Sequence, residues 1–176
     1  HEDLQMAVLI KEVVPAEYAF VMHTVNPSNG RRDELFGELV LGLGETLVGN
    51  YPGRALSFVY SKTTGAQSLL SFQGKSVGLY GDGLIFRSDS SGEDLAGYAG
   101  AGLYDSVLLK VPRSVDLDYT QQPLLWDEPF RQNLIATIAR IGLEVERISG
   151  SPQDIEGAVA GTNYYVVQTR PQVGLD

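Results

Sequence analysis

The sequence has 176 residues, 43% of them hydrophobic, and no apolar run reaches the roughly 18 residues that a bilayer-spanning helix needs, so no membrane partner is expected. The 22 acidic residues outnumber the 13 basic ones, and a net charge of −9 disfavours binding to nucleic acid. Cysteine is absent and histidine occurs twice, which excludes disulfides and thiolate metal sites, argues against a histidine zinc site, and favours a reducing, intracellular compartment.

The amino-terminal third is predicted to consist of extended segments separated by turns. Residues 6–24 are rich in β-branched and aromatic residues, and the turn at Pro15 divides them into two strands. Residues 26–30 form a turn cluster, because proline fixes φ and Asn and Gly tolerate positive φ. Residues 34–41 are predicted to form a third extended segment, with a helix as the alternative.

The next segments alternate between glycine-rich connections and short strands. Residues 42–50 are either a glycine-punctuated loop or a short helix. A strand over residues 55–62 places Leu56, Phe58 and Tyr60 on one face.

The middle of the chain is poorer in periodic signals. Residues 63–83 are predicted to form a loop or hairpin connection, and residues 84–86 a short buried strand. Residues 87–102 are polar and glycine-rich, and residues 106–111 are strand-like. The fold class that follows is mixed α/β (α+β), with a largely antiparallel sheet.

One long helix is predicted between Asp127 and Gly150. Asp127 is a plausible N-cap, Glu128 and Pro129 suit the first turn, and Gly150 suits the carboxyl end. A stripe with a period of 3.6 residues marks its buried face. The stripe consists of Phe130, Leu134, Ile138, Ile141, Val145 and Ile148.

Residues 154–171 are predicted to form a β-hairpin. If its turn is the three residues 161–163, Ala160 lies opposite Tyr164, Glu156 opposite Gln168, and Asp154 opposite Arg170. The last two pairs then share one face of the sheet, whereas Tyr165 and Val167 point toward a core. A two-residue turn would shift the register and divide the polar set between both faces.

This polar patch allows two interpretations. It is either a solvated sheet face with an ordinary Asp–Arg pair, or a metal–phosphate site. Carboxylate and amide oxygens suit Mg²⁺, which commonly uses one or two carboxylates together with phosphate oxygens, and a guanidinium suits phosphate.

Weaker candidate features lie elsewhere. Residues 87–106 combine Arg87 with small residues whose backbone amides would allow an anion to approach, and Glu45 lies between glycines. His23 lies in an apolar segment and is expected to be a core or face residue rather than a base or phosphoryl carrier. Three aromatic residues have the ring types that stack on sugars, although core packing is expected for Trp126. These are Tyr98, Tyr119 and Trp126.

Four segments together resemble the nucleotide-binding region of the phosphoenolpyruvate synthase and pyruvate phosphate dikinase family, whose relatives include starch-modifying glucan, water dikinases. They are MAVLIKEVVPAEYAFVMHTVNPSNG, GLGETLVG, IFRSDSSGEDLAGYAGAGLYDSV and DIEG…YYVVQTRP. In the synthase branch the RSD/EDL-type segment precedes the GLGE-type segment. Here Arg87 follows Glu45, an order that resembles the glucan dikinase branch.

The resemblance implies an ATP-grasp-like lobe covering residues 1–176 and a set of site residues. Glu156 and Gln168, twelve residues apart, match the positions that hold divalent metal, and Arg87 and Arg170 match phosphate-contacting arginines. Asp154 matches an acidic residue of the site. Two further residues match the strand whose backbone binds adenine. They are Glu12 and Val14.

The resemblance further implies a piece of a larger, plastid-located dikinase, and the start at His1 rather than Met agrees with this. The expected reaction uses ATP and Mg²⁺, passes the β-phosphate through a phosphohistidine domain of the parent chain to starch, and releases the γ-phosphate. The fragment is expected to be inactive alone, because the family's glycine-loop lysine and carrier histidine are missing from it. The alternatives are phosphoglucan, water dikinase, another dikinase of the group, or a non-catalytic glucan-binding or regulatory module.

Overall fold

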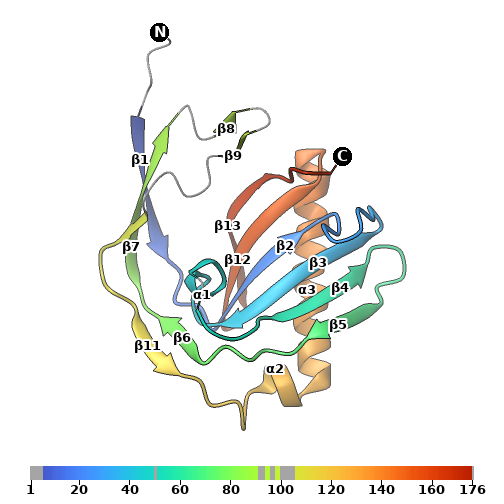
Figure 1. The fold of residues 1–176 in the computed structure, drawn as a ribbon, viewed down its shortest axis with the longest axis horizontal. Coiled ribbons are helices and arrows are strands. Elements are labelled where there is room, and N and C mark those ends of the chain that lie inside the picture. Colours follow the sequence, from blue (N-terminus) through green and yellow to red (C-terminus); the bar gives the residue numbers. More distant parts are fainter. Residues whose placement is uncertain (1–5, 50, 91–93, 96–97, 100–105, 176) are drawn as a thin grey trace.

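Six antiparallel strands form the main sheet of the computed structural model, which describes residues 6–49, 51–90, 94–95, 98–99 and 106–175 (Figure 1). Their order across the sheet is β13-β12-β2-β3-β4-β5. The strands are β2 (Tyr18–His23), β3 (Glu34–Leu41), β4 (Leu56–Ser61), β5 (Gln67–Ser71), β12 (Gln153–Ala160) and β13 (Asn163–Pro171). The carboxyl-terminal hairpin therefore occupies one edge, next to a strand from the beginning of the chain.

A second, three-stranded sheet pairs segments distant in sequence. Its order is β1-β7-β10, formed by β1 (Met6–Val13), β7 (Gly83–Ser90) and β10 (Ser106–Leu108). Residues 84–86 thus belong to a longer strand than predicted, and Leu84 is 37% exposed rather than buried.

Besides the long helix, the described part of the chain has two small ladders and two short helices. The ladders pair β6 (Val77–Tyr80) with β11 (Arg113–Asp116), and β8 (Asp94–Leu95) with β9 (Tyr98–Ala99). The helices are α1 (Glu45–Val48) and α2 (Pro123–Trp126). The short-helix alternative for residues 42–50 is therefore correct, and the extended segment predicted for residues 34–41 is confirmed as β3.

The predicted long helix is α3 (Glu128–Ser149), and both of its ends are as expected. The Asp127 carboxylate accepts a hydrogen bond of 2.9 Å from the amide of Phe130, and Gly150 takes the left-handed conformation with φ of 69°. Figure 1 shows α3 covering one face of the six-stranded sheet. Ile148 at its last turn is exposed, so the buried stripe ends before the helix does.

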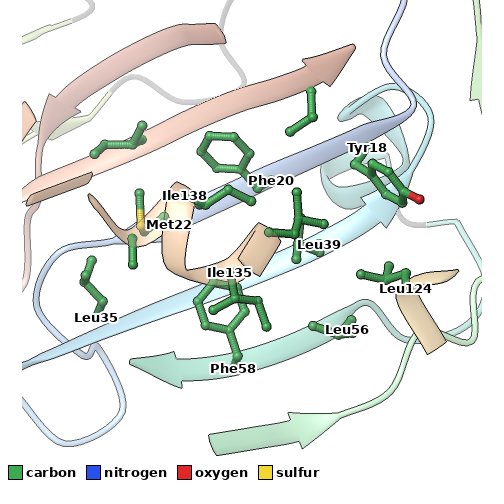
Figure 2. Close-up of a cluster of buried hydrophobic side chains, with 14 of the residues drawn as sticks. Tyr18, Phe20, Met22, Leu35, Leu39, Leu56, Phe58, Leu124, Ile135 and Ile138 are labelled. Atoms are coloured by element: carbon green, nitrogen blue, oxygen red, sulfur yellow. The ribbon is translucent and has the colours of Figure 1, made fainter. Parts of the chain in front are cut away.

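The core lies between α3 and this face of the sheet (Figure 2). Leu56, Phe58 and Tyr60 share this face as predicted. Leu56 and Phe58 are fully buried, and Tyr60 packs against their cluster. Trp126 is 72% exposed, which contradicts the predicted core position. Its indole N–H donates to the carbonyl of Tyr119 at 2.6 Å, so the ring lies along the surface at the end of α2.

Two cross-strand pairs in this core place a phenylalanine ring over a glycine. Phe20 lies opposite Gly157 between β2 and β12, and Phe58 lies opposite Gly37 between β3 and β4. A Cβ atom added to Gly157 would lie 2.0 Å from Phe20 Cζ, and one added to Gly37 would lie 2.4 Å from Phe58 Cζ. Each ring therefore occupies the volume that a side chain would need.

Among the described residues, no helix is both long and apolar enough to cross a membrane.

Tyr18 at the edge of the core gives the protein a predicted sensitivity to alkali. Burial, reinforced by the charge of Glu17, raises the pKa of Tyr18 from 10.0 to about 12. Between these values the unfolded chain releases a proton that the folded chain keeps, so the free energy of unfolding falls as pH rises. We expect denaturant titrations across this pH range to show a shallower fall for Tyr18→Phe. An identical fall for both proteins would contradict the assignment.

Candidate functional site

The turn of the carboxyl-terminal hairpin has two residues, not the predicted three. Ala160 pairs with Asn163, leaving Gly161 and Thr162 in the turn, and Gly161 has φ of 58°. The predicted pairing of Ala160 with Tyr164 is therefore wrong. A left-handed conformation at the first turn residue suits glycine, which explains why the chain turns one residue earlier.

A β-bulge restores the predicted pairing further along the hairpin. The register shifts between Glu156 and Gly157, so that Gly157 pairs with Val166 while Glu156 pairs with Gln168. Val167 is the extra residue of the bulge, and Asp154 pairs with Arg170 beyond it. A two-residue turn followed by a one-residue bulge gives the same offset as a three-residue turn.

The bulge therefore gathers the predicted polar residues on one face, away from α3. Asp154, Glu156 and their partners alternate with Ile155, which is fully buried on the helix-covered face. Tyr165 and Val167 are exposed rather than pointed at a core, since β13 is an edge strand. Tyr164 packs against the core instead, because the early turn shifts the alternation by one residue.

Asp154 and Arg170 form a close ion pair on this face, near the open end of the hairpin. Both Nε and Nη2 of Arg170 donate to Oδ2 of Asp154, at 2.9 and 2.8 Å. The Asp154 side chain is 14% exposed and that of Arg170 is 40% exposed. The pair thus lies at the boundary between sheet and solvent, where water screens it only in part.

Two positively charged side chains of the small sheet donate hydrogen bonds to the hairpin. Arg87 on β7 donates through Nη1 to Oε1 of Gln168, and Nζ of Lys11 on β1 donates to the carbonyl of Val167 at 3.0 Å. Figure 1 shows the ribbon formed by β1 and β7 standing apart from the main sheet beside β13. The carbonyl of the bulge residue thus accepts a hydrogen bond from a lysine, and two positively charged side chains of the small sheet lie at the hairpin.

The oxygen atoms of Glu156 and Gln168 suit a hard divalent cation that a bound anion also coordinates. Glu156 contributes a carboxylate and Gln168 an amide oxygen from directly paired positions on one face. The Gln168 oxygen accepts a hydrogen bond from the Arg87 guanidinium, which would have to turn away before that oxygen could bind a metal. Within the described residues no cluster of three or more His, Cys, Asp or Glu side chains forms a complete cage. Ligands from a bound anion, such as phosphate oxygens, would therefore have to complete the coordination.

The two predicted adenine-strand residues lie away from this cluster. Glu12 is exposed on β1, opposite Leu84, and its neighbour Lys11 is the residue that reaches the hairpin. The alternation of side chains along a strand places Glu12 on the other face of the small sheet. Val14 follows β1 and packs in a small apolar cluster that includes Ala158 of β12.

Sequence reasoning missed two residues of the site. Lys11 donates to the bulge carbonyl, which no local pattern predicts, because the contact spans 156 positions. His23 faces Asp154 across the β2–β12 ladder and was predicted to be a core or face residue rather than a base. No local pattern indicates this pairing, because His23 and Asp154 are about 130 positions apart in the sequence. Most of the glycine-rich segment 91–105 lies outside the described residues, and Glu45 is an exposed residue of α1.

The hairpin brings carboxylate, amide and guanidinium groups together next to Lys11 and Arg87 of the small sheet, and this arrangement defines a candidate nucleotide–metal site. Residues 1–65 match the family described as "Pyruvate phosphate dikinase, AMP/ATP-binding domain". The chain is 54% identical over 175 residues to the chloroplastic alpha-glucan water dikinase of Solanum tuberosum, and 53% identical to alpha-glucan water dikinase 1, chloroplastic, of Arabidopsis thaliana. These alignments cover 98% of this chain and 12% of each relative.

A more distant similarity extends to another branch of the family. The chain is 29% identical over 171 residues to a probable phosphoenolpyruvate synthase of Methanocaldococcus jannaschii, covering 97% of the chain and 12% of that protein. The resemblance predicted from the sequence motifs is therefore confirmed, both for the family and for its glucan dikinase branch. The chain spans about one eighth of the length of these relatives.

Proposed function

We propose that the face of the carboxyl-terminal hairpin opposite α3 binds the phosphates of ATP together with Mg²⁺. The observation that carries this proposal is the convergence of two separate sheets on one spot. Arg87 of the small sheet contacts Gln168 directly beside Glu156, while Arg170 is held by Asp154 two residues along the same face. A chain with a net charge of −9 needs local cations or metal to attract a triphosphate, and this spot supplies both a cationic pair and metal ligands.

Each residue then has a distinct role. Glu156 and Gln168 hold Mg²⁺ by oxygen ligands, and phosphate oxygens complete its coordination. The bound metal neutralises phosphate charge. Arg87 and Arg170 donate to phosphate oxygens where negative charge develops during transfer, and Asp154 keeps the Arg170 guanidinium on the site. Glu12 and Val14 contribute backbone near the adenine. The two facing sheets form an ATP-grasp-like arrangement in this proposal.

The proposed parent is a larger glucan, water dikinase in which residues 1–176 form the ATP-binding region. Its substrates are ATP, water and the glucosyl units of starch, and the phosphoryl group passes through a histidine on another domain of the same chain. Named relatives of high identity are chloroplastic, which supports a plastid location. The fragment alone is expected to bind nucleotide without completing the transfer.

The test uses the whole dikinase polypeptide with ATP labelled at either the β or the γ position. We expect β-label on glucan, γ-label in inorganic phosphate, and loss of both when EDTA removes divalent metal. Label on glucan only when the glucan is already phosphorylated would favour phosphoglucan, water dikinase. Label on pyruvate would favour a synthase, and binding of maltooligosaccharide without any nucleotide turnover would contradict the proposal in favour of a glucan-binding module.

A further inference from the structure

Two buried polar atoms beside the candidate site lack hydrogen-bond partners. They are Nδ1 of His23 and Oδ1 of Asp154, which lie 3.7 Å apart and make no hydrogen bond to the described part of the chain. Leaving a buried donor or acceptor unsatisfied is costly, and here two such atoms face each other. One Nδ1–H proton directed at Oδ1, after the two atoms approach by about 0.5–1 Å, would satisfy both.

The fold holds these two residues in place for such a contact. His23 and Asp154 are direct partners in the β2–β12 ladder, so their side chains share a face. The imidazole ring stacks on Phe36 of β3, with ring centroids 6.3 Å apart and planes inclined by 28°. The ring is therefore supported from one side by β3 and directed at β12 on the other.

The carboxylate of Asp154 has a separate partner for each oxygen. Arg170 takes Oδ2 with both of its contacting nitrogens, while Oδ1 is left to His23. An Arg170 fork that uses a single oxygen does not by itself fix the plane of the carboxylate. A second contact at Oδ1 fixes the plane of the carboxylate. It thereby also fixes the direction in which the Arg170 guanidinium points.

We infer that His23 is a positioning residue: by binding Oδ1 of Asp154 it orients the Asp154–Arg170 pair toward the phosphates of the nucleotide. This inference rests on the proposed function of Arg170. His23 neither contacts the nucleotide nor carries the phosphoryl group. It forms the outer member of a chain that runs from His23 through Asp154 to Arg170.

The test compares His23→Leu with His23→Asn in the whole dikinase. Leu and Asn have nearly the same shape, but only Asn offers an amide N–H close to the place of Nδ1. We expect His23→Leu to lower kcat/KM for ATP by roughly 10- to 100-fold with an unchanged KM for glucan, and His23→Asn to restore most of the loss. A purely structural role predicts the reverse order, since Leu packs better than Asn against Phe36.

Arg170→Ala, measured alongside, separates this inference from the proposal on which it rests. If Arg170→Ala leaves kcat/KM for ATP unchanged, the proposed function of this face fails, and the inference fails with it. If Arg170→Ala lowers it while His23→Leu does not, or while the Leu and Asn variants are equally impaired, only the positioning role is overturned. Circular dichroism of each variant identifies a protein that has failed to fold. If a His23 variant fails to fold, Phe36→Leu is measured in its place, because it removes the ring that supports the imidazole. We expect Phe36→Leu to reproduce part of the loss in kcat/KM for ATP, and an unchanged kcat/KM would overturn the positioning role.

Discussion

Replacing Glu156 by Gln in the whole dikinase is expected to lower kcat/KM for ATP by about 1000-fold. The substitution keeps the size of the side chain and its pairing with Gln168, but it removes the carboxylate charge that we propose holds Mg²⁺ on the triphosphate. The loss should be partly relieved by raising the Mg²⁺ concentration, because a weakened metal site is refilled by mass action. Steady-state kinetics at several Mg²⁺ concentrations measure both effects.

Glu128→Gln provides the matched control for this prediction. Glu128 is an exposed residue of the first turn of α3, on the opposite side of the main sheet, and its carboxylate contacts only the Gln132 side chain among the described residues. The substitution Glu128→Gln changes the net charge by the same amount as Glu156→Gln. Equal losses in both variants would show a general charge effect and would remove Glu156 from the metal site.

Gly157→Ala is expected to lower the free energy of unfolding by about 3 kcal/mol. The new methyl group would lie within 2.0–2.6 Å of three atoms of the Phe20 ring, which is 1% exposed and packed in the core. The ring must leave its position over the glycine, or β12 must move away from β2. Because small domains are stable by only about 5–15 kcal/mol, urea denaturation should detect the change easily.

A control and a rescue make this prediction specific to the Phe20–Gly157 contact. Gly74→Ala adds the same methyl group where nothing lies within 4 Å, and it should leave stability within about 0.5 kcal/mol. The double substitution Phe20→Leu with Gly157→Ala gives the methyl group room and should be more stable than the sum of the two single changes predicts. Strict additivity would show that the ring and the glycine do not interact as described.

The carboxyl-terminal hairpin shows how far local reasoning from the sequence extends. Alternation and residue type placed Glu156 opposite Gln168 and Asp154 opposite Arg170, and both pairs are present. The three-residue turn from which these pairs were predicted was wrong. The turn has two residues, and a bulge at Val167 restores the offset. A bulge has little local signature. It is selected here by contacts made elsewhere, including the bond from Lys11 to its carbonyl.

Contacts between distant segments account for the other differences. The long helix could be predicted, because its caps and period lie within one stretch of chain. The pairing of β1 with β7 joins residues about 80 positions apart, so nothing local predicted that Arg87 would be presented to Gln168 from a second sheet. Trp126 was misplaced for the same reason, since its exposure depends on where α2 ends relative to the core.

The most direct test of the nucleotide site is paramagnetic broadening in the isotopically labelled 176-residue chain, with Mg²⁺ replaced by Mn²⁺ in the presence of ATP. We expect the amide signals of Glu156 and Gln168 to broaden first, signals from the middle of α3 to stay sharp, and Glu156→Gln to abolish the pattern. Mg²⁺ with ATP serves as the diamagnetic reference. Broadening centred on α3, or broadening near the hairpin that persists unchanged in Glu156→Gln, would contradict a metal–triphosphate site on this face.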